Sequence, residues 1–191
     1  MTVPARSAER ESRMPKLERL AWIAPLSEGK GVTLTDDPAA DKFLAESPDG
    51  LLIGVLLDSQ YPTRKAFAAP LLLRDRLGYL DMKKITLKES DELIEVFRQQ
   101  PALHRFPRKF AQLTQQLAAF VVDHYGGDSS RIWTEAKDAD ELGNRLYALP
   151  AFGVEKTNWT VGMLGVLGVL PFDGWEEYRI QPPKGKRVAA S

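Results

Sequence analysis

The sequence predicts an all-α fold, and three observations support this prediction. In the segment 107–125, apolar side chains recur at helical spacing and define one buried face. Helix boundary signals are frequent, with Ser47 followed by Pro48 at one start and the Gly126-Gly127 pair at one end. No run alternates between apolar and polar residues strongly enough to build a sheet, and no repeat-protein period appears.

The expected elements follow one another with short connections. Up to residue 37 we expect an irregular chain, with "WIAPL" and "GVTLT" as short extended pieces. The helical pattern starts with "PAADKFLAE" and continues in "SPDGLLIGVLLDSQ", which is apolar nearly all round and therefore belongs in the centre of the core. A helix that starts at Pro62 is expected to bend at Pro70 and to end at Gly78. The remaining predicted helices are "KESDELIEVFRQQ", the long segment 107–125, and two helices that flank residues 145–159.

The composition is that of one folded domain of ordinary size. The 191 residues are 43% hydrophobic and 27% charged, which suits a globular chain rather than a disordered one. The absence of cysteine excludes a disulfide scaffold, an iron–sulfur cluster, a cysteine nucleophile and a thiolate zinc site. We expect an irregular leader over 1–37, a compact helical domain over 38–178 and a flexible tail over 179–191.

Nothing in the sequence predicts contact with a membrane. The first twenty residues lack an apolar core of signal-peptide length. The longest uncharged apolar run, 159–172, is shorter than the roughly 20 residues needed to cross a bilayer. We therefore expect a soluble, intracellular protein, and a monomer.

The charge pattern leaves a nucleic-acid partner open. The net charge is +0, whereas proteins that bind nucleic acid often carry a basic excess. Positive charge is nevertheless concentrated in "LHRFPRKF", where His104, Arg105, Arg108 and Lys109 stand without an acidic residue. An ordinary solvated face explains this cluster equally well.

The stretch "RLYALPAFGVEKTNW" predicts two helices joined by a tight turn. Pro150 fixes one φ angle, and Gly153 permits a positive one. The first amides of the helix that follows have no intrahelical partner and lie at the positive end of its dipole, so they can hold a phosphate group. The alternative is a plain helical hairpin without a ligand, which the turn alone favours.

Three further features accompany this turn. Gly162, Gly165 and Gly168 form a stripe that allows close packing against the second helix. Asp173 follows a long uncharged segment, so it could cap the next short helix from a partly buried place or act as a desolvated carboxylate beside a pocket. Gln60 ends the very apolar helix predicted in the first half of the chain.

Together these residues resemble the helix-hairpin-helix (HhH-GPD) DNA glycosylases, and in particular their endonuclease III-like members. The hairpin "LPAFG" is similar to the Leu-Pro-Gly-Val-Gly of that family, and Asp173 follows Leu149 by 24 residues, as the family's catalytic Asp does. "LLIGVLLDSQ" is similar to a family helix that ends in a glutamine, here Gln60, which enters the DNA stack. The resemblance covers roughly residues 38–178 and is closest to an uncharacterised bacterial branch with "PALHRFP" and a terminal "GW".

The resemblance implies an all-α helix-hairpin-helix fold and base excision on double-stranded DNA in the cytoplasm, at the nucleoid. The protein would flip a damaged base out of the duplex, and Asp173 would help water to hydrolyse its N-glycosidic bond. The implied DNA-binding residues are Gln60, Arg105, Arg108, Lys109 and the amides of Ala151, Gly153 and Glu155. The implied base pocket contains Trp159, Trp175 and Asp58, although Trp159 could equally be a core residue. The carbonyls of Tyr147, Leu149 and Phe152 could complete a monovalent-cation site, and no other cofactor is expected.

Several positions depart from the family pattern. Ala151 stands where the hairpin has its first glycine, and the four-cysteine cluster is missing. The Schiff-base lysine position of bifunctional members is Glu155 here, and Lys156 is one residue further on, which turns a helical side chain by about 100°. We therefore expect a monofunctional glycosylase without lyase activity. The rival interpretations are a non-catalytic DNA-binding module with the same fold, which a short helix after Asp173 would favour, and an all-α interaction domain without a nucleic-acid partner.

Overall fold

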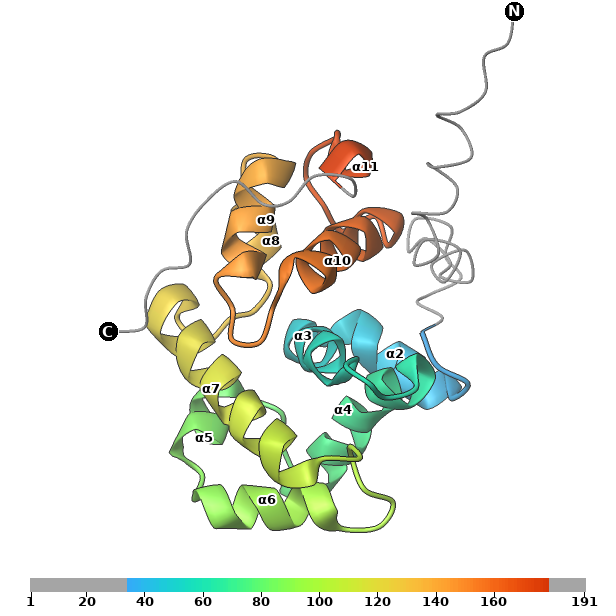
Figure 1. Cartoon of the computed structure of the whole chain (residues 1–191), viewed down its shortest axis with the longest axis vertical. Coiled ribbons are helices and arrows are strands. Elements are labelled where there is room, and N and C mark those ends of the chain that lie inside the picture. Colours follow the sequence, from blue (N-terminus) through green and yellow to red (C-terminus); the bar gives the residue numbers. More distant parts are fainter. Residues whose placement is uncertain (1–33, 179–191) are drawn as a thin grey trace, which may run out of the picture.

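The computed structural model describes residues 34–178, and each regular element in this range is an α-helix (Figure 1). This confirms the all-α prediction for the described part of the chain. The expected leader up to residue 33, with "WIAPL", and the expected tail from 179 lie outside the described residues. The helices are α2 (Pro38–Glu46), α3 (Pro48–Leu57), α4 (Thr63–Leu77), α5 (Met82–Leu87), α6 (Ser90–Arg98), α7 (Pro107–Tyr125), α8 (Arg131–Thr134), α9 (Ala139–Tyr147), α10 (Val154–Val166) and α11 (Trp175–Tyr178).

The predicted boundary signals act where the sequence places them. The Ser47 side chain accepts a hydrogen bond from the Gly50 amide at 3.0 Å and so caps the start of α3, with Pro48 in the first helical turn. Gly78 ends α4 in the left-handed conformation with φ 77°, and Gly126 ends α7 in the same way with φ 67°. The main helices of the sequence prediction are therefore confirmed.

Two short helices were not expected from the sequence. α5 has six residues and α8 has four, which is too short for a helical period to show in the sequence. α5 is started by Asp81, whose carboxylate accepts a hydrogen bond from the Lys84 amide at 2.9 Å. α5 also packs on α7, whereas α8 has no side-chain cap and packs on α9.

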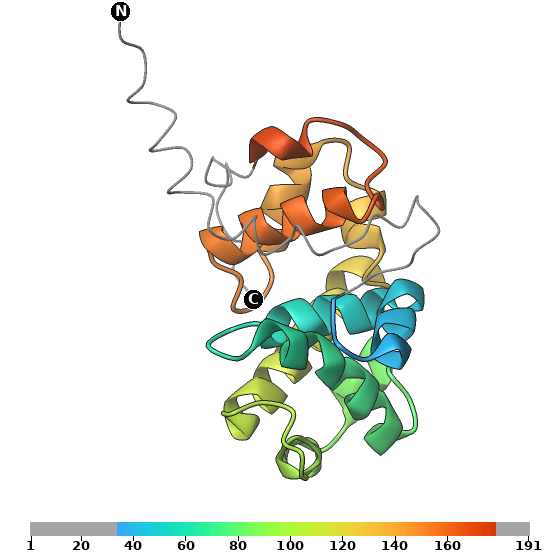
Figure 2. The ribbon, with the colours of Figure 1, turned by 90° about the vertical axis from the view of Figure 1, so that its right-hand side faces the viewer.

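The helices form two groups. α2 to α7 make the first group, in which α4 packs on α3 while α5 and α6 pack on α7. α8 to α11 make the second group, in which α9 and α11 pack on α10 (Figure 2). α3 lies at the centre, and its residues 50–57 are all buried, as its apolar sequence predicts. Within residues 34–178, none of the helices is both long and apolar enough to span a membrane.

Gly165 explains part of the glycine stripe. A Cβ atom on Gly165 would overlap the Trp175 ring, so only glycine admits the tryptophan at this position. Trp175 thereby attaches α11 to α10 and closes the loop that contains Asp173.

Candidate functional site

A cavity of about 660 Å³ lies between the two helix groups. This volume is in the range of cavities that hold small organic ligands, roughly 300 to 1,000 Å³. Three segments that are distant in sequence line it: the end of α3 with the loop after it, the start of α7, and the turn before α10 with the first turns of that helix. Seven residues selected from the sequence line this cavity, namely Asp58, Gln60, Lys109, Ala151, Gly153, Glu155 and Trp159.

The turn between α9 and α10 has the amides expected of the hairpin but a different backbone conformation. Ala151 has φ 62°, in the left-handed region, whereas Gly153 has φ −88° and ψ 177° and is extended. The expectation of a positive φ at Gly153 is therefore wrong, and the strained position is Ala151, where the resemblance implies a glycine. The first helical hydrogen bond of α10 runs from the Thr157 amide to the Gly153 carbonyl, at 2.9 Å, so the preceding amides lie before the helical ladder.

The loop after α3 carries a second strained residue. Gln60 has φ 53°, which is uncommon for a residue with a side chain, and its side chain is exposed at the cavity. Arg105 Nη1 lies 3.5 Å from the Gln60 carbonyl oxygen, and the Arg105 guanidinium lies 4.6 Å from the centre of the Phe106 ring. The structure therefore brings Gln60 and Arg105, two of the DNA-binding residues that the resemblance implies, side by side.

His104 is not part of a basic surface, which corrects the interpretation of "LHRFPRKF" as one exposed cluster. Its side chain is fully buried, while Arg105, Arg108 and Lys109 are exposed. The Phe106 amide donates to Nδ1 at 3.1 Å, so Nε2 carries the proton and donates to the Ser59 carbonyl at 3.1 Å. Burial lowers the pKa of His104, and the charges of Arg105 and Lys156 act in the same direction.

Lys156 crosses from α10 to the end of α3. Its Nζ donates to the carbonyls of Val55 and Leu56 at 2.9 and 2.8 Å, and to the Ser59 hydroxyl at 2.8 Å. An ammonium group has three donors, and these three acceptors match them. The last carbonyls of a helix also lie at the negative end of its dipole, which favours a cation there.

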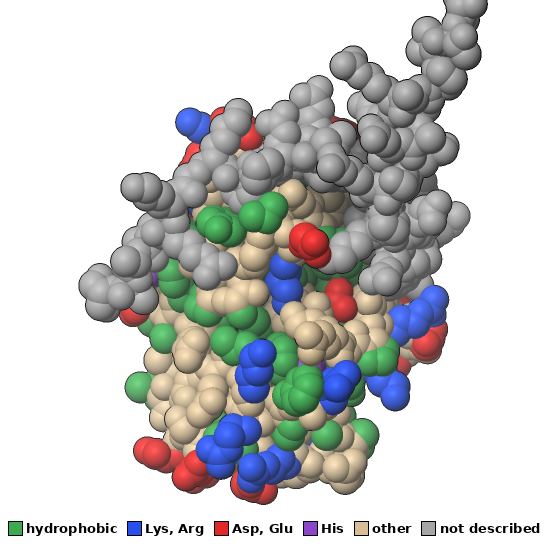
Figure 3. All heavy atoms as spheres, in the orientation of Figure 1, with side chains coloured by type: hydrophobic (Ala, Val, Ile, Leu, Met, Phe, Trp, Pro, Cys, Tyr) green, Lys and Arg blue, Asp and Glu red, His purple; other side chains and the backbone are tan. Residues whose placement is uncertain are grey.

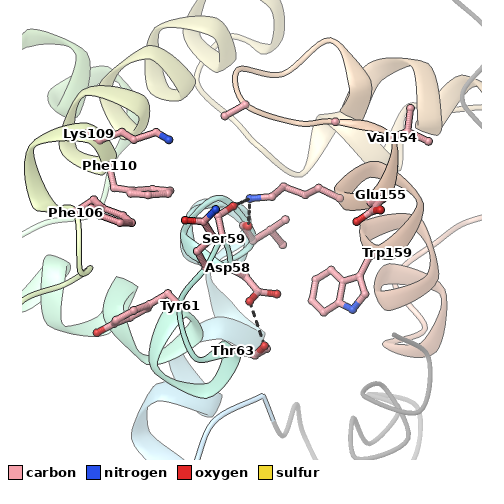
Figure 4. Close-up of a pocket in the computed structure, with 15 residues that line it drawn as sticks. Asp58, Ser59, Tyr61, Thr63, Phe106, Lys109, Phe110, Val154, Glu155 and Trp159 are labelled. Carbon is pink, nitrogen blue, oxygen red and sulfur yellow. Dashed lines mark hydrogen bonds between the residues drawn. The ribbon is translucent and has the colours of Figure 1, made fainter. Parts of the chain in front are cut away.

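Aromatic and acidic side chains face each other in the cavity. Asp58 and Trp159 point toward one another, with Glu155 beside Trp159 on α10 and Lys109 on the opposite wall (Figure 4). One oxygen of Asp58 accepts the Thr63 hydroxyl at 3.1 Å. Trp159 retains an exposed fraction of 9%, and its ring centre lies 5.8 Å from that of Phe67, so it is both a core residue and a wall of the cavity.

Asp173 and Trp175 lie outside the cavity lining. Asp173 is exposed, so the expected partly buried position is wrong. It forms no hydrogen bond or ion pair within residues 34–178, so its carboxylate does not cap α11 from inside the described structure. Trp175 packs on Gly165 instead of lining the pocket.

The remaining selected residues lie around the cavity. Arg105 and Arg108 are exposed near the start of α7. On the face drawn in Figure 3, Lys and Arg side chains extend from the middle of the molecule to its lower end. Tyr147, Leu149 and Phe152 lie at the end of α9 and in the turn that follows. The Leu149 carbonyl accepts the Phe152 amide at 3.2 Å, so it has one further lone pair for a cation.

Several residues at this site were not selected from the sequence. Tyr61 and Phe106 line the cavity, and Ser59 and His104 fix the loop that carries Gln60. Lys156 directly precedes the long uncharged segment 157–172, and this position is a sequence signal for its role. A lysine beside a buried segment needs polar partners for its ammonium group when it is itself half-buried.

Comparison with solved structures finds chains with a similar fold. No family model and no curated protein matches the chain. A solved structure of a trapped endonuclease III–DNA covalent intermediate, an estranged-adenine complex, is similar with a TM-score of 0.51 and 19% sequence identity. The match covers 87% of this chain and 62% of that chain, so this chain spans less than two thirds of its neighbour. The chain therefore has the all-α helix-hairpin-helix fold of endonuclease III, built from a sequence that contains no cysteine.

Proposed function

We propose that this protein is a monofunctional DNA glycosylase, which binds duplex DNA, accepts a damaged base in its cavity and hydrolyses the N-glycosidic bond. The observation that carries the proposal is the arrangement of the hairpin turn, the Gln60 loop and Trp159 around one cavity of about 660 Å³ in the endonuclease III fold. The similar solved structure is a DNA complex, which supports duplex DNA as the partner.

The DNA backbone would be held beside the cavity. The amides of Ala151, Gly153 and Glu155 lie at the turn and at the start of α10, where a phosphate group is favoured. Arg105, Arg108 and Lys109 would add ionic contacts with phosphates, which makes binding fall as salt rises. A potassium or sodium ion held by carbonyls of the hairpin turn would add positive charge at the same place.

A flipped base would be stacked and recognised inside the cavity. Trp159 offers an aromatic face, and the Asp58 carboxylate opposite it accepts hydrogen bonds from N–H groups. Gln60, with Arg105 beside it, would fill the space that the base leaves in the duplex. Removing a base from the stack costs a few kcal/mol, and these contacts would offset that cost.

Asp173 and Asp58 are the two carboxylates that we considered for the catalytic role. Asp173 has the family spacing and would stabilise the positive charge that develops on the sugar, while Asp58 already lines the cavity. Asp173 is our candidate, because it has the spacing that the resemblance implies and its carboxylate is exposed. Lys156 is a poor nucleophile in this arrangement, since its amine is held as a donor to three acceptors, and this supports hydrolysis without a covalent lyase step.

A screen of duplexes that each contain one lesion tests the proposal. The expected result is release of a free base from at least one duplex, with the abasic strand left intact. Salt-dependent binding to every duplex without base release would instead establish the non-catalytic DNA-binding module. No binding to any duplex at low salt would overturn both and leave an interaction domain.

A further inference from the structure

We infer that Lys156 is a positioning residue, which sets the Gln60 wedge by tying the hairpin helix to the loop after α3. This inference rests on the proposed function and assigns a role to a residue that performs no chemistry in it. The observation is a continuous chain of hydrogen bonds across the cavity, from Lys156 through Ser59 to His104.

The first link joins the two helix groups. Lys156 and Val55 are 101 positions apart in the sequence, yet Nζ of the lysine lies 2.9 Å from the valine carbonyl oxygen. α10 and α3 share no large direct packing surface, because α10 packs on α9 and α11 while α3 packs on α4. A half-buried charged contact of this kind therefore contributes strongly to how the hairpin is placed relative to the end of α3.

The second link fixes Ser59 from both sides. Its hydroxyl accepts Lys156 from the hairpin side, and its carbonyl accepts His104 Nε2–H from the opposite wall. The His104 ring is held in turn by the Phe110 ring, with 3.6 Å between the ring centres, and by the Phe106 amide. Ser59 is thus the junction between the two walls of the cavity.

The third link is the wedge itself. Gln60 follows Ser59 directly and has φ 53°, a conformation that costs about 1–2 kcal/mol for a residue with a side chain. Such strain persists only where the surroundings impose it. The bonds to the Ser59 hydroxyl and carbonyl and the contact of Arg105 with the Gln60 carbonyl hold this loop on both sides of Gln60, in addition to the Asp58–Thr63 bond.

The inference predicts how Lys156 affects the preference for DNA with a vacated base position. Phosphate groups held at the start of α10 and a wedge held at Gln60 would be kept in register by one lysine. Loss of Lys156 should therefore leave general duplex binding in place but release the wedge from its strained conformation. Preference for DNA with a vacated base position would fall, while affinity for intact duplex would change little.

The test compares binding of two duplexes, one intact and one with a stable abasic-site analogue, by the full chain and its variants. Lys156→Met should reduce the preference for the abasic duplex about tenfold, as expected for lost hydrogen bonds to a charged group. Lys109→Met is the matched control, since it removes a lysine from the opposite wall of the same cavity without touching Ser59. It should weaken binding to both duplexes equally and leave the preference unchanged.

Two further measurements separate positioning from a loss of folding. Ser59→Ala removes only the hydroxyl acceptor and should give a smaller loss of preference in the same direction. In a Gln60→Ala background, Lys156→Met should cause no additional loss, because it acts through Gln60. A 2-aminopurine base placed opposite the abasic site should also lose its protein-induced fluorescence change in Lys156→Met.

The outcomes distinguish this inference from the function on which it rests. If Gln60→Ala loses the abasic preference while folded Lys156→Met and Ser59→Ala keep it, Lys156 is no positioning residue and the proposed function stands. An additional loss from Lys156→Met in the Gln60→Ala background would overturn the inference in the same way. If the wild type shows no abasic preference, the wedge and the inference fail together.

Discussion

Single backbone angles decide how the hairpin turn can be altered. Ala151 has φ 62°, where the Cβ atom of an L-residue is strained by about 1–2 kcal/mol. Gly153 has φ −88°, and a Cβ atom built there meets no atom within 4 Å. Strain in this turn is therefore located at the alanine, and the glycine at 153 leaves open space where a DNA backbone would approach.

Ala151→Gly should raise the free energy of unfolding by about 0.5–1 kcal/mol. Glycine relieves the left-handed strain, and the extra freedom of the unfolded chain offsets only part of that gain. Urea unfolding of the variant beside the wild type measures the change. Gly153→Ala is the matched control, with little loss of stability expected; a destabilised Ala151→Gly would show that the strain is not at this residue.

Gly153→Val should weaken duplex binding while the protein stays folded. The reason is steric, because the added side chain would occupy the open space in front of the turn. Backbone strain is not the reason, since φ at Gly153 is −88°. A titration with labelled duplex should show a loss of about tenfold or more. Unchanged affinity would count against the turn as a phosphate site.

Contacts between helices position two loops of the proposed site. α11 is a single turn whose Trp175 ring lies against Gly165 of α10, and the loop with Asp173 connects these two helices. The loop between α6 and α7 is held by His104, which is buried between Tyr61 and Phe110, with 4.6 and 3.6 Å between the ring centres. Both loops carry residues of the proposed site, so their stability bears on function.

Gly165→Ala should destabilise the protein by about 1–3 kcal/mol, because its methyl group would overlap the Trp175 ring. Denaturant unfolding measures this loss. In a Trp175→Ala background the same substitution should cost much less, since the overlapping ring is gone. Equal costs in both backgrounds would show that Trp175 does not pack on Gly165.

Stability should fall as the pH drops below about 6.5, the ordinary pKa of histidine. The pKa of His104 is lowered in the folded protein. Between that lowered pKa and about 6.5, His104 is therefore protonated in the unfolded chain but not in the folded protein. His104 therefore contributes stability that is present above pH 6.5 and is lost as the pH falls through its folded pKa. Unfolding midpoints between pH 8 and 5 should show this slope, and His104→Phe should flatten it. His124→Gln, at an exposed position on α7, is the control, and an unchanged slope in His104→Phe would contradict this assignment.

The sequence predicts some elements well because their signals are local. Boundary residues (serine, proline or glycine) and long apolar patterns predict α3, α4 and α7. Gln60 and Trp159, which the family resemblance selected, both line the cavity. The link from Lys156 to Ser59 could not, because residues 97 positions apart meet only through tertiary packing. Nor does the sequence show that Ala151 is the residue of "LPAFG" with the positive φ.

In the whole molecule, the two helix groups line the cavity together, and exposed positive charge lies beside it. Net charge is +0, so attraction to DNA would depend on where the charges lie and not on their sum. Arg105, Arg108 and Lys109 are exposed at or near the start of α7, and the hairpin amides add no formal charge. Binding of modest strength with a clear salt dependence follows from this arrangement.

Each phosphate contact that is lost should reduce the salt dependence of duplex binding by a defined amount. Arg108→Gln should lower the slope of log K against log salt by about 0.9 in magnitude, as one lost ionic contact does. Titrations at several salt concentrations measure the slope. Arg131→Gln is the control, because Arg131 is paired with Glu135 on the second helix group. An unchanged slope for Arg108→Gln would remove Arg108 from the interface.

Base release by two carboxylate variants is the most direct measurement of the proposed activity. On a duplex from which the wild type releases a base, Asp173→Asn should slow single-turnover release at least about 100-fold while duplex affinity is retained. Asp58→Asn changes the carboxylate that already lines the cavity and should weaken recognition of the base more than the rate of the chemical step. The released strand should stay intact and form no borohydride-trapped adduct with the protein. Release by Asp173→Asn at the wild-type rate, or a trapped adduct that disappears in Lys156→Met, would contradict Asp-assisted hydrolysis by this protein.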